Sequence, residues 1–398
     1  MDHLAIALEN QYGAHNYAPL PVVLVKGEGV YVWDDQGKRY LDMMSAYSAV
    51  SHGHANPRIL QAMIEQAKTL GVTSRAYHNR LLGKLFEKLC KITGQDRMLP
   101  MNTGAEAVET ALKAARKWGY EKKGIPANQA EIICCANNFH GRTIAIVGMS
   151  SEPQYRQGFG PFPPGFIQVP FGDAQALEQA ITANSCAFLV EPIQGEGGII
   201  LPPDGYLKAC ENLCRQHNVL LLCDEVQTGL GRTGKWFAHQ HEQVKPDGLI
   251  VGKALGGGLY PVSAFLAKEE VMRCFHPGDH GSTFGGNPIA CAIALEALSI
   301  LEESDLIANS AKLGEYFKAE LQKISSSLIK EVRGRGLFIG IEIDIQQRSA
   351  RSICEALLQE GLLSKETHDC LIRLAPPLII SKEQIDDALE IIRRVFAG

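Results

Sequence analysis

The amino-acid sequence predicts an α/β fold, with a mainly parallel sheet flanked by helices and a smaller α+β domain formed by the two ends of the chain. Three observations support this prediction. Short apolar runs, such as residues 219–223 and 249–251, are long enough for strands buried on both faces and too short for helices. Helical patterns alternate with these runs, as they do in proteins with parallel sheets. After about residue 329 the pattern changes to strand, helix, strand and helix.

The first part of the chain has a strand-like pattern. Residues 16–47 predict three brief strands, the last two joined at Asp35-Gln36-Gly37. Asn56 then fits an N-cap with Pro57 at the first helical position. The helix is indicated by apolar residues at helical spacing: Ile59, Leu60, Met63, Ile64, Ala67 and Leu70.

A second helix is predicted to begin within residues 102–107 and to run to about Tyr120. Thr103 and Gly104 at its start would leave free backbone N–H groups and the positive end of the helix dipole pointing outward, which suits a phosphate. An ordinary Thr103 cap explains the same stretch equally well.

Strands and helices alternate through the middle of the chain. We expect strands over residues 131–136, 143–147 and 186–190, and a helix over residues 207–216. Residues 158–172 are rich in Gly, Pro and Phe and have no period, which is typical of functional or interface loops. A polar, glycine-rich turn over residues 280–288 precedes a long helix that begins near Ile289.

The C-terminal tail predicts a strand over residues 336–343, a helix, a strand over residues 370–374 and a final helix. Ser381 and Gln384 fit a capping box for that last helix. We expect the tail to pack with the N-terminal strands. The predicted divisions are an N-terminal segment of the small domain, a large domain and a C-terminal small domain, over residues 1–50, 51–290 and 291–398.

The most informative stretch runs from Val219 to Gly258. Asp224 directly follows the first apolar run, and Lys253 follows the second. In open parallel sheets, ligands bind beyond the carboxyl ends of the strands, so a carboxylate and an amine are expected at one rim. A desolvated lysine there can lose its proton and attack an aldehyde. Taken singly, a loop lysine and a helix cap explain these residues about as well.

Two nucleotide-binding patterns in this region are rejected. Gly229, Gly231 and Gly234 spell G-x-G-x-x-G, and Gly234-Lys235 nearly completes a P-loop. Trp236 stands where a P-loop needs a hydroxyl. The glycines also do not directly follow the strand, and the carboxylates between would repel a pyrophosphate.

Composition narrows the class of protein. The 398 residues carry a net charge of −5, which gives no reason to expect nucleic acid or an anionic membrane as a partner. The first ten residues do not resemble a signal peptide, and no apolar run is long enough to span a bilayer. The eleven cysteines are scattered without a C-x-x-C pair, which predicts buried, reduced thiols in a cytoplasmic protein rather than disulfides or a zinc site.

Five features together match the needs of pyridoxal 5′-phosphate. Gly104 offers a seat for an anion, Phe139 a platform for a ring, and Asp224 a partner for a pyridinium nitrogen. Gln227 offers a donor to the ring oxygen, and Lys253 an amine for a Schiff base. A charge pair near 4 Å is worth roughly 4 kcal/mol at an effective dielectric of about 20, which would keep such a nitrogen protonated.

With these residues in place, the chain resembles the class-III aminotransferases of fold type I, from Asn16 to Arg373 and beyond. The most specific motifs are M-N-T-G-A-E-A, N-F-H-G-R-T, E-P-I-Q-G-E-G-G, D-E-V-Q-T-G, G-K-A-L-G-G-G and H-G-S-T-F-G-G-N-P. The resemblance implies that Lys253 bonds to the cofactor and moves the proton. It also implies that Asp224 pairs with the ring nitrogen, Gln227 with the ring hydroxyl, and that Phe139 stacks on the ring.

The same resemblance implies a phosphate site and a homodimer. Thr103, Gly104 and Ala105 would bind the cofactor at the helix start, with backbone N–H groups of Gly104 and Ala105 on the phosphate. Thr283 would reach the phosphate from the second subunit. Active sites would then lie at the interface of a twofold dimer.

Within the family, the chain is similar to the bacterial members that act on ornithine. The similarity implies that Arg142 binds the α-carboxylate of ornithine as a bidentate fork and that Arg373 binds the α-carboxylate of 2-oxoglutarate. Glu196 would neutralise Arg373 while ornithine is bound. Tyr17 and Tyr47 would line the ornithine pocket. At His140 the chain agrees with bacterial and acetylornithine-using members, whereas animal members carry tryptophan.

The expected reaction transfers the δ-amino group of L-ornithine to 2-oxoglutarate, giving glutamate and glutamate 5-semialdehyde, which cyclises to pyrroline-5-carboxylate. One alternative is another ω-aminotransferase, acting on N-acetylornithine or 4-aminobutyrate with the same cofactor. A second is a nicotinamide-dependent oxidoreductase that uses Gly229, Gly231 and Gly234. A third is an interaction protein built on an inactive enzyme scaffold, which the intact set of expected catalytic residues disfavours.

Overall fold

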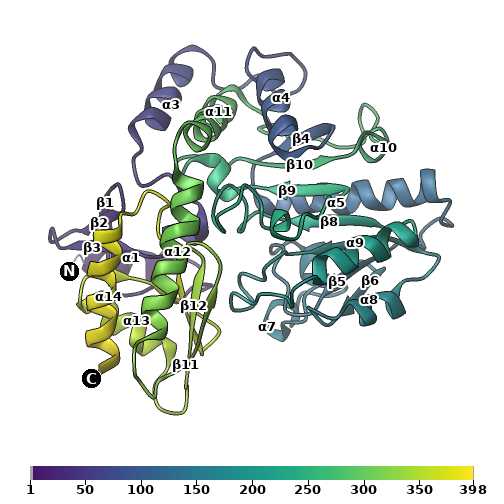
Figure 1. Cartoon of the computed structure of the whole chain (residues 1–398). Coiled ribbons are helices and arrows are strands. Elements are labelled where there is room, and N and C mark those ends of the chain that lie inside the picture. The colour runs from purple at the N-terminus through teal and green to yellow at the C-terminus, as the bar shows by residue number, and fades with distance from the viewer. Residues whose placement is uncertain (1–2, 398) are drawn as a thin grey trace.

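The computed structural model describes residues 3–397, with a seven-stranded sheet at its centre (Figure 1). The strand order is β4-β10-β9-β8-β7-β5-β6; β10 is antiparallel to both its neighbours, and the other pairs are parallel. The strands are β4 (Arg97–Met101), β5 (Glu131–Cys135), β6 (Phe166–Val169), β7 (Ser185–Val190), β8 (Leu220–Asp224), β9 (Gly248–Val251) and β10 (Ser263–Ala267). The mainly parallel sheet expected from the sequence is confirmed.

Helices cover both faces of this sheet. Ile132 and Leu222 pack in one cluster with the apolar residues of α5 (Gly104–Trp118). Ile133 and Leu221, one position along the same strands, pack in the other cluster with α9 (Tyr206–Gln216), because successive strand residues face opposite sides. The other helices of this region are α3 (Pro57–Thr69), α4 (Leu82–Thr93), α6 (Ile144–Gly148), α7 (Pro153–Arg156), α8 (Ala174–Ala180), α10 (Glu269–Met272), α11 (Pro288–Glu303), the π-helix η1 (Gly119–Lys123) and the 3-10 helices η2 (Ala238–Glu242) and η3 (Lys253–Gly256).

Two smaller sheets and their helices lie beside the large sheet, on the left of Figure 1. One has the order β1-β2-β3-β13, with β1 (Leu24–Glu28), β2 (Tyr31–Asp34), β3 (Arg39–Asp42) and β13 (Leu362–Leu363). The other has the order β11-β12-β15-β14, with β11 (Ile329–Gly334), β12 (Ile339–Ile343), β14 (Lys365–Thr367) and β15 (Leu371–Leu374). The helices here are α1 (His3–Tyr12), α2 (Ser45–Ser48), α12 (Leu306–Gln322), α13 (Ala350–Gln359) and α14 (Lys382–Ala397).

The two ends of the chain share the first of these small sheets. β13 pairs in parallel with β3, through Leu362 opposite Leu41 and Leu363 opposite Asp42. The expected packing of the C-terminal tail on the N-terminal strands is therefore present. The domain divisions after residues 50 and 290 remain a prediction.

The helix starts predicted from capping residues are confirmed. The Asn56 side chain accepts hydrogen bonds from the backbone of Arg58 and Ile59. Ser381 and Gln384 bond reciprocally at the start of α14. Thr103 caps α5 in a full capping box with Glu106. The N-cap predicted at Thr103 is therefore confirmed, and it does not prevent the helix start from binding an anion as well.

Two predictions in the middle of the chain are wrong. Residues 143–147 form no strand, because both neighbouring positions of β5 are taken by β6 and β7; the segment folds as α6 and buries Ile146 and Val147. Residues 158–172 are not wholly irregular, because Phe166–Val169 forms β6 at the edge of the sheet. In both cases sheet pairing decided the structure, and the local pattern did not.

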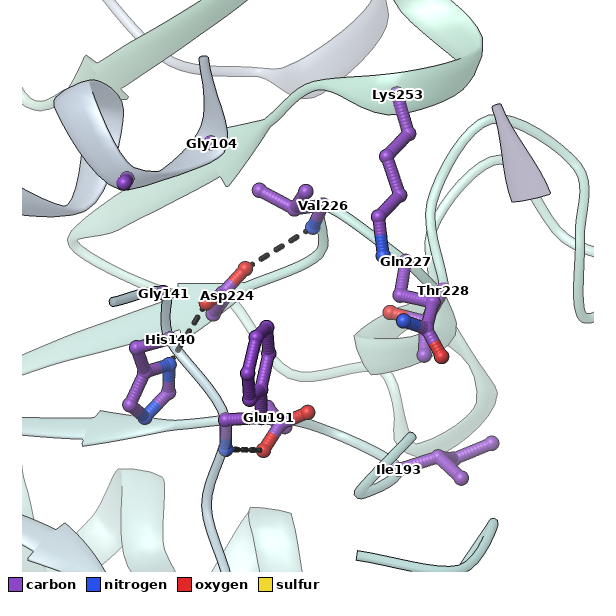
Figure 2. A pocket seen from close by; sticks show the side chains of 12 residues that line it. Gly104, His140, Gly141, Glu191, Ile193, Asp224, Val226, Gln227, Thr228 and Lys253 are labelled. Carbon is purple, nitrogen blue, oxygen red and sulfur yellow. Dashed lines mark hydrogen bonds and ion pairs between the residues drawn. The ribbon is translucent and has the colours of Figure 1, made fainter. Parts of the chain in front are cut away.

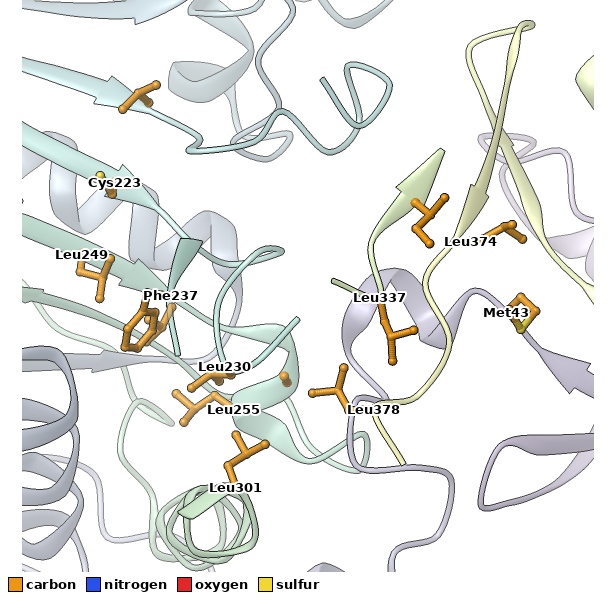
Figure 3. Close-up of a cluster of buried hydrophobic side chains, with 14 of the residues drawn as sticks. Met43, Cys223, Leu230, Phe237, Leu249, Leu255, Leu301, Leu337, Leu374 and Leu378 are labelled. Carbon is orange, nitrogen blue, oxygen red and sulfur yellow. The ribbon is translucent and has the colours of Figure 1, made fainter. Parts of the chain in front are cut away.

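One hydrophobic cluster joins all three parts of the chain. It runs from Met43 through Cys223 and Leu249 of the large sheet to Leu337 and Leu374, as Figure 3 shows. Such a continuous core holds the small sheets firmly against the large one, with the ends of β8 and β9 at the junction.

The remaining global expectations concern thiols and membranes. All eleven cysteines are free, and nine of them are buried. Within residues 3–397, no helix is long and apolar enough to cross a bilayer.

Gly314 of α12 provides a test of this packing. A Cβ at this position would lie 2.1 Å from the carbonyl carbon of Gly336, so Gly314→Ala should lower the free energy of unfolding by roughly 1–3 kcal/mol. Gly83 of α4 has open space around it, so Gly83→Ala should raise stability by about 0.4–1 kcal/mol. Denaturant unfolding of both variants checks the pair. If both variants changed the free energy of unfolding equally, the close approach of α12 to residue 336 would be contradicted.

Candidate active site

A cavity of about 180 Å³ opens at the carboxyl ends of β8 and β9. The parallel pairing of these neighbouring strands brings Asp224 and Lys253 to its wall, as expected for ligand sites in open sheets (Figure 2). The lining residues are Gly104, Ala105, Phe139, His140, Gly141, Glu191, Ile193, Asp224, Val226, Gln227, Thr228 and Lys253.

Asp224 is held firmly at the end of β8. Its Oδ2 lies 2.7 Å from Nδ1 of His140, and its Oδ1 accepts a hydrogen bond of 3.1 Å from the backbone N–H of Val226. Burial alone would lower the pKa of His140, but the bond to Asp224 and its charge raise it overall. The result is a buried carboxylate in a fixed orientation at the cavity wall.

Lys253 enters the cavity from the turn after β9. Its backbone is left-handed, with φ of +45°. The pKa of its amine is lowered to about 8, chiefly by burial; the charge of Glu196 opposes this shift, Arg373 adds to it, and Asp224 and Glu191 oppose it. Within residues 3–397 the amine has no hydrogen-bond or ion-pair partner. It is therefore available as a nucleophile near neutral pH.

The start of α5 forms another wall and can receive an anion. Gly104 and Ala105 carry the first backbone N–H groups of the helix. A Cβ on Gly104 would lie 3.0 Å from the Val226 side chain, and a Cβ on Gly141 would lie 2.9 Å from Ala105. The glycines therefore let three chain segments approach closely around the helix start.

A second cavity, of about 250 Å³, is lined by Arg142, Tyr17 and Tyr155, among others. The guanidinium of Arg142 lies 4.1 Å from the ring centre of Tyr155 and 5.4 Å from that of Phe139. Tyr155 in turn meets Phe139 edge to face. Arg142 is exposed, so its charge is open to a carboxylate that enters from solvent.

A second arginine lies deeper. Arg373 is only 1% exposed, and its Nη1 donates to Oε1 of Glu196 at 2.8 Å. Burial would raise the pKa of Glu196, but Arg373 lowers it to about 2, so the pair is charged at neutral pH. Gln227 donates to the same Glu196 oxygen at 3.2 Å. The Oε1 of Gln227 is buried and has no partner within the described chain.

Tyr47 lies between the cationic groups of the site. Its ring centre is 5.2 Å from the guanidinium carbon of Arg373 and 5.9 Å from the amine of Lys253. Tyr47 and Tyr17 also line a third, mostly apolar cavity of about 480 Å³. The two tyrosines named from the sequence therefore share one cavity, and Tyr47 also lies near Lys253.

Two predicted residues lie outside the cavity wall. Thr103 serves as the N-cap of α5, one residue before the wall begins. Thr283 is exposed, in a loop tied to the start of α5 by the bond from Asn102 to Ser282. That Thr283 reaches the phosphate from a second subunit stays a prediction.

Glu191 and Tyr155 belong to the site but were not named from the sequence, and His140 was named only as a difference from animal members. Glu191 accepts hydrogen bonds from the backbone of Phe139 and Gly195, and burial raises its pKa to about 7. The motifs E-P-I-Q-G-E-G-G and N-F-H-G-R-T contain Glu191 and His140 and could have drawn attention to them. Tyr155 follows no such motif.

Other features near the site are structural. Glu225 is buried and binds the ring and backbone of His239 and the hydroxyl of Thr228, which fixes the turn after Asp224. Gly231 and Gly234 lie in turns at positive φ, and a Cβ on Gly234 would lie 2.8 Å from the Ala311 backbone. These glycines are therefore needed for packing. No cluster of three or more metal-ligating side chains occurs within residues 3–397.

Chemically, the arrangement offers an anion seat, an aromatic ring, a fixed carboxylate and an amine of lowered pKa around one cavity, with two guanidinium groups nearby. It is suited to a flat, phosphorylated, cationic ring with an aldehyde, and to substrates that carry carboxylates.

Comparison with known proteins agrees with this chemistry. Residues 12–396 match the sequence profile described as aminotransferase class-III. The chain is 58% identical to the ornithine aminotransferase of Geobacillus sp. (strain WCH70), over 99% of this chain and 98% of that protein. It is 59% identical to ornithine aminotransferase 2 of Staphylococcus aureus (strain MRSA252), over 98% of each.

Solved structures match the chain over nearly its whole length. The ornithine aminotransferase of Toxoplasma gondii, described with partial occupancy of PLP at its active site, is 45% identical, with a TM-score of 0.98 over 99% of this chain and 93% of that one. The acetylornithine aminotransferase of Elizabethkingia anophelis is 50% identical, with a TM-score of 0.90 over 99% of this chain and 98% of that one.

The lowered pKa of Lys253 predicts its reactivity. In protein freed of bound small molecules, acylation of Lys253, followed by peptide mass spectrometry, should rise through a midpoint near pH 8, because the amine loses its proton there. Glu196→Gln should move the midpoint lower, since the Glu196 charge raises this pKa. A wild-type midpoint near the ordinary value for lysine, about 10.4, would contradict the environment described here.

Proposed function

The chain belongs to the class-III aminotransferases, and we propose that it transfers the δ-amino group of L-ornithine to 2-oxoglutarate. The products would be glutamate and glutamate 5-semialdehyde, which cyclises to pyrroline-5-carboxylate. The observation that carries the proposal is the ion pair of the buried Arg373 with the part-buried Glu196, beside Lys253. This pair gives the site a second carboxylate-binding group that is neutralised in the resting protein. The names of relatives 58–59% identical to this chain point to the same substrate.

Pyridoxal 5′-phosphate is the cofactor of the family, and the residues present fit it. Gly104 and Ala105 would hold its phosphate, Phe139 would lie on its ring, and Asp224 would pair with the ring nitrogen. Gln227 has a buried oxygen without a partner in the described chain, which fits a donor on the ring. Thr103 would support the helix start, and Thr283 would act from a second subunit. When bound, the cofactor supplies an aldehyde for amines and a ring that withdraws electrons.

This chain's residues would control the proton and the charge. Lys253, uncharged above about pH 8, can take a proton from the carbon beside the bound amine and return it. Asp224 would keep a proton on the ring nitrogen, because His140 and the Val226 N–H fix its carboxylate. Glu191 would hold the segment that carries Phe139 through its bond to the Phe139 backbone.

The two arginines would decide which amine reaches Lys253. Arg142 would bind the α-carboxylate of ornithine, which directs the distal amine inward, while Tyr17 and Tyr47 line its path. Arg373 would bind the α-carboxylate of 2-oxoglutarate after Glu196 moves away. Since removing one partner of a buried ion pair strands the other charge, a substrate carboxylate is the natural replacement for Glu196.

We also propose a homodimer with active sites at the interface, in the cytoplasm. Thr283 and its exposed loop are the reason for expecting a contribution from the second subunit. Eleven free cysteines fit a reducing compartment. No nucleic acid or membrane partner is proposed.

N-acetylornithine is the second candidate donor, because the Elizabethkingia anophelis relative is named for it. An acetyl group removes the charge of the α-amine, so the two donors place different groups near Tyr17 and Tyr47.

A donor panel tests the proposed function. Purified holoenzyme should convert L-ornithine and 2-oxoglutarate to pyrroline-5-carboxylate, with nitrogen-15 from the δ-position appearing in glutamate. We expect kcat/KM for ornithine to exceed that for N-acetylornithine and 4-aminobutyrate at least tenfold, a difference of about 1.4 kcal/mol in transition-state binding. A preference for N-acetylornithine would overturn the substrate assignment.

Replacing Glu196 tests the gate. Glu196→Ala should raise the half-reaction rate with glutamate relative to ornithine about tenfold or more, because Arg373 is left charged and unpaired. Stopped-flow absorbance with each amino acid measures the ratio. Thr367→Val removes a neutral partner of Arg373, the 2.7 Å bond to its Nη2, and should move the ratio less. An unchanged ratio in Glu196→Ala would show that Glu196 is no gate.

A further inference from the structure

Tyr47 stands on an unusual piece of backbone. Four successive residues that are not glycine, Ser45, Ala46, Tyr47 and Ser48, have φ of +50°, +46°, +60° and +76°. With ψ of 52° at Ala46 and 43° at Tyr47, the central residues match a left-handed helical turn. Residues with a Cβ visit this region singly, and a run of four is strained.

Within the turn, the backbone N–H groups of Tyr47 and Ala49 donate to the carbonyls of Met44 and Ala46, at 3.1 Å and 3.3 Å. The hydroxyls of Ser45 and Ser48 are buried, yet neither has a hydrogen-bond partner in the part of the chain described. Strained backbone persists only where its surroundings fix it, so the contacts at the two ends of the turn must provide the restraint.

Asp42 fixes the start of the turn. Its Oδ1 accepts hydrogen bonds of 2.9 Å from the backbone N–H groups of both Met44 and Ser45. Its Oδ2 lies 2.7 Å from Nε2 of His54, which keeps the carboxylate in place. The buried Asp42 side chain therefore fixes the start of the turn.

Ser51 and Arg232 fix the end of the turn. The Ser51 hydroxyl donates to the Ser48 carbonyl at 2.9 Å and accepts from Nη2 of Arg232 at 3.0 Å. Arg232 is fully buried, and its Nη1 donates to the carbonyls of Leu337 and Pro376. These bonds tie the turn to the segment that follows β15, the strand that carries Arg373.

The left-handed turn determines where the ring of Tyr47 lies. The left-handed turn directs Tyr47 toward Arg373 and Lys253, at 5.2 Å and 5.9 Å from its ring centre. A right-handed turn at this place would direct the side chain elsewhere, because handedness sets the direction of each Cα–Cβ bond.

We propose that Asp42 and Ser51 are positioning residues for the amino donor, which they affect by locking the left-handed turn that presents Tyr47 to the site. The proposal rests on the proposed function for the substrate role of Tyr47. Asp42 and Ser51 act through the backbone, because their side chains bind the main chain at the two ends of the turn.

A double-mutant cycle tests this relation in the holoenzyme, with the donor that reacts fastest in the panel above. Ser51→Ala should raise KM for that donor about fivefold while kcat stays within twofold, because Tyr47 is no longer held. In the Tyr47→Ala background, Ser51→Ala should leave KM unchanged, since no ring remains to be placed. Equal effects of Ser51→Ala in both backgrounds would overturn the proposal.

Asp42 offers a conservative pair. Asp42→Asn keeps an oxygen for the two N–H groups, and His54 can serve the amide as an acceptor, so KM should stay within twofold. Asp42→Ala removes the acceptor and should raise KM about as much as Ser51→Ala. A large effect of Asp42→Asn together with a small one of Asp42→Ala would contradict the lock.

Thermal unfolding of the holoenzyme tests the strain without reference to activity. Ala46 is exposed in the left-handed turn, and Ala67 is exposed in the right-handed helix α3. Ala46→Gly should leave Tm unchanged or raise it, whereas Ala67→Gly should lower it by about 1–3 °C. Equal losses would overturn the strained turn. Because the cycle uses whichever donor reacts, failure of the ornithine assignment would appear in the panel and leave this test readable.

Discussion

Parallel pairing of β8 with β9 is the constraint on which the site depends. Both strands are buried on both faces, so their register is fixed by the core, and Asp224 and Lys253 emerge together at the carboxyl rim. The start of α5, the Phe139 segment and the Glu196 segment then close around that rim. A slip of one residue between the two strands would turn Asp224 away from the cavity that Lys253 enters.

The site brings together charged side chains that are rare in a stable protein core. Burial disfavours the charges of Lys253 and Glu196, and Arg373 lies against Glu196 and holds the pKa of that carboxyl low. The continuous core that spans the three sheets stabilises this arrangement from outside. The strained turn under Tyr47 follows the same logic, since Asp42 and Ser51 fix its ends and Arg232 ties Ser51 to the segment after β15.

The sequence predicted several strands, helix caps and the order of the site residues, because these features depend on local pattern. The buried strands at residues 219 and 249, the Asn56 and Ser381 caps, and the order of the site residues could all be read from it. The strand expected at residues 143–147 and the irregular loop at residues 158–172 were wrong, because neighbouring strands decide which segment joins a sheet edge. The bond of His140 to Asp224, the role of Glu191 and the left-handed turn at Tyr47 depend on contacts between distant segments, which no local pattern carries.

The most direct measurement concerns the attachment of the cofactor. Borohydride reduction of the purified holoenzyme, followed by peptide mapping, should place a single pyridoxyl group on Lys253, the lysine that the rim of β9 presents to Asp224 across the cavity. A label on Lys235, in the glycine-rich turn after β8, or on any other lysine would contradict the site described here.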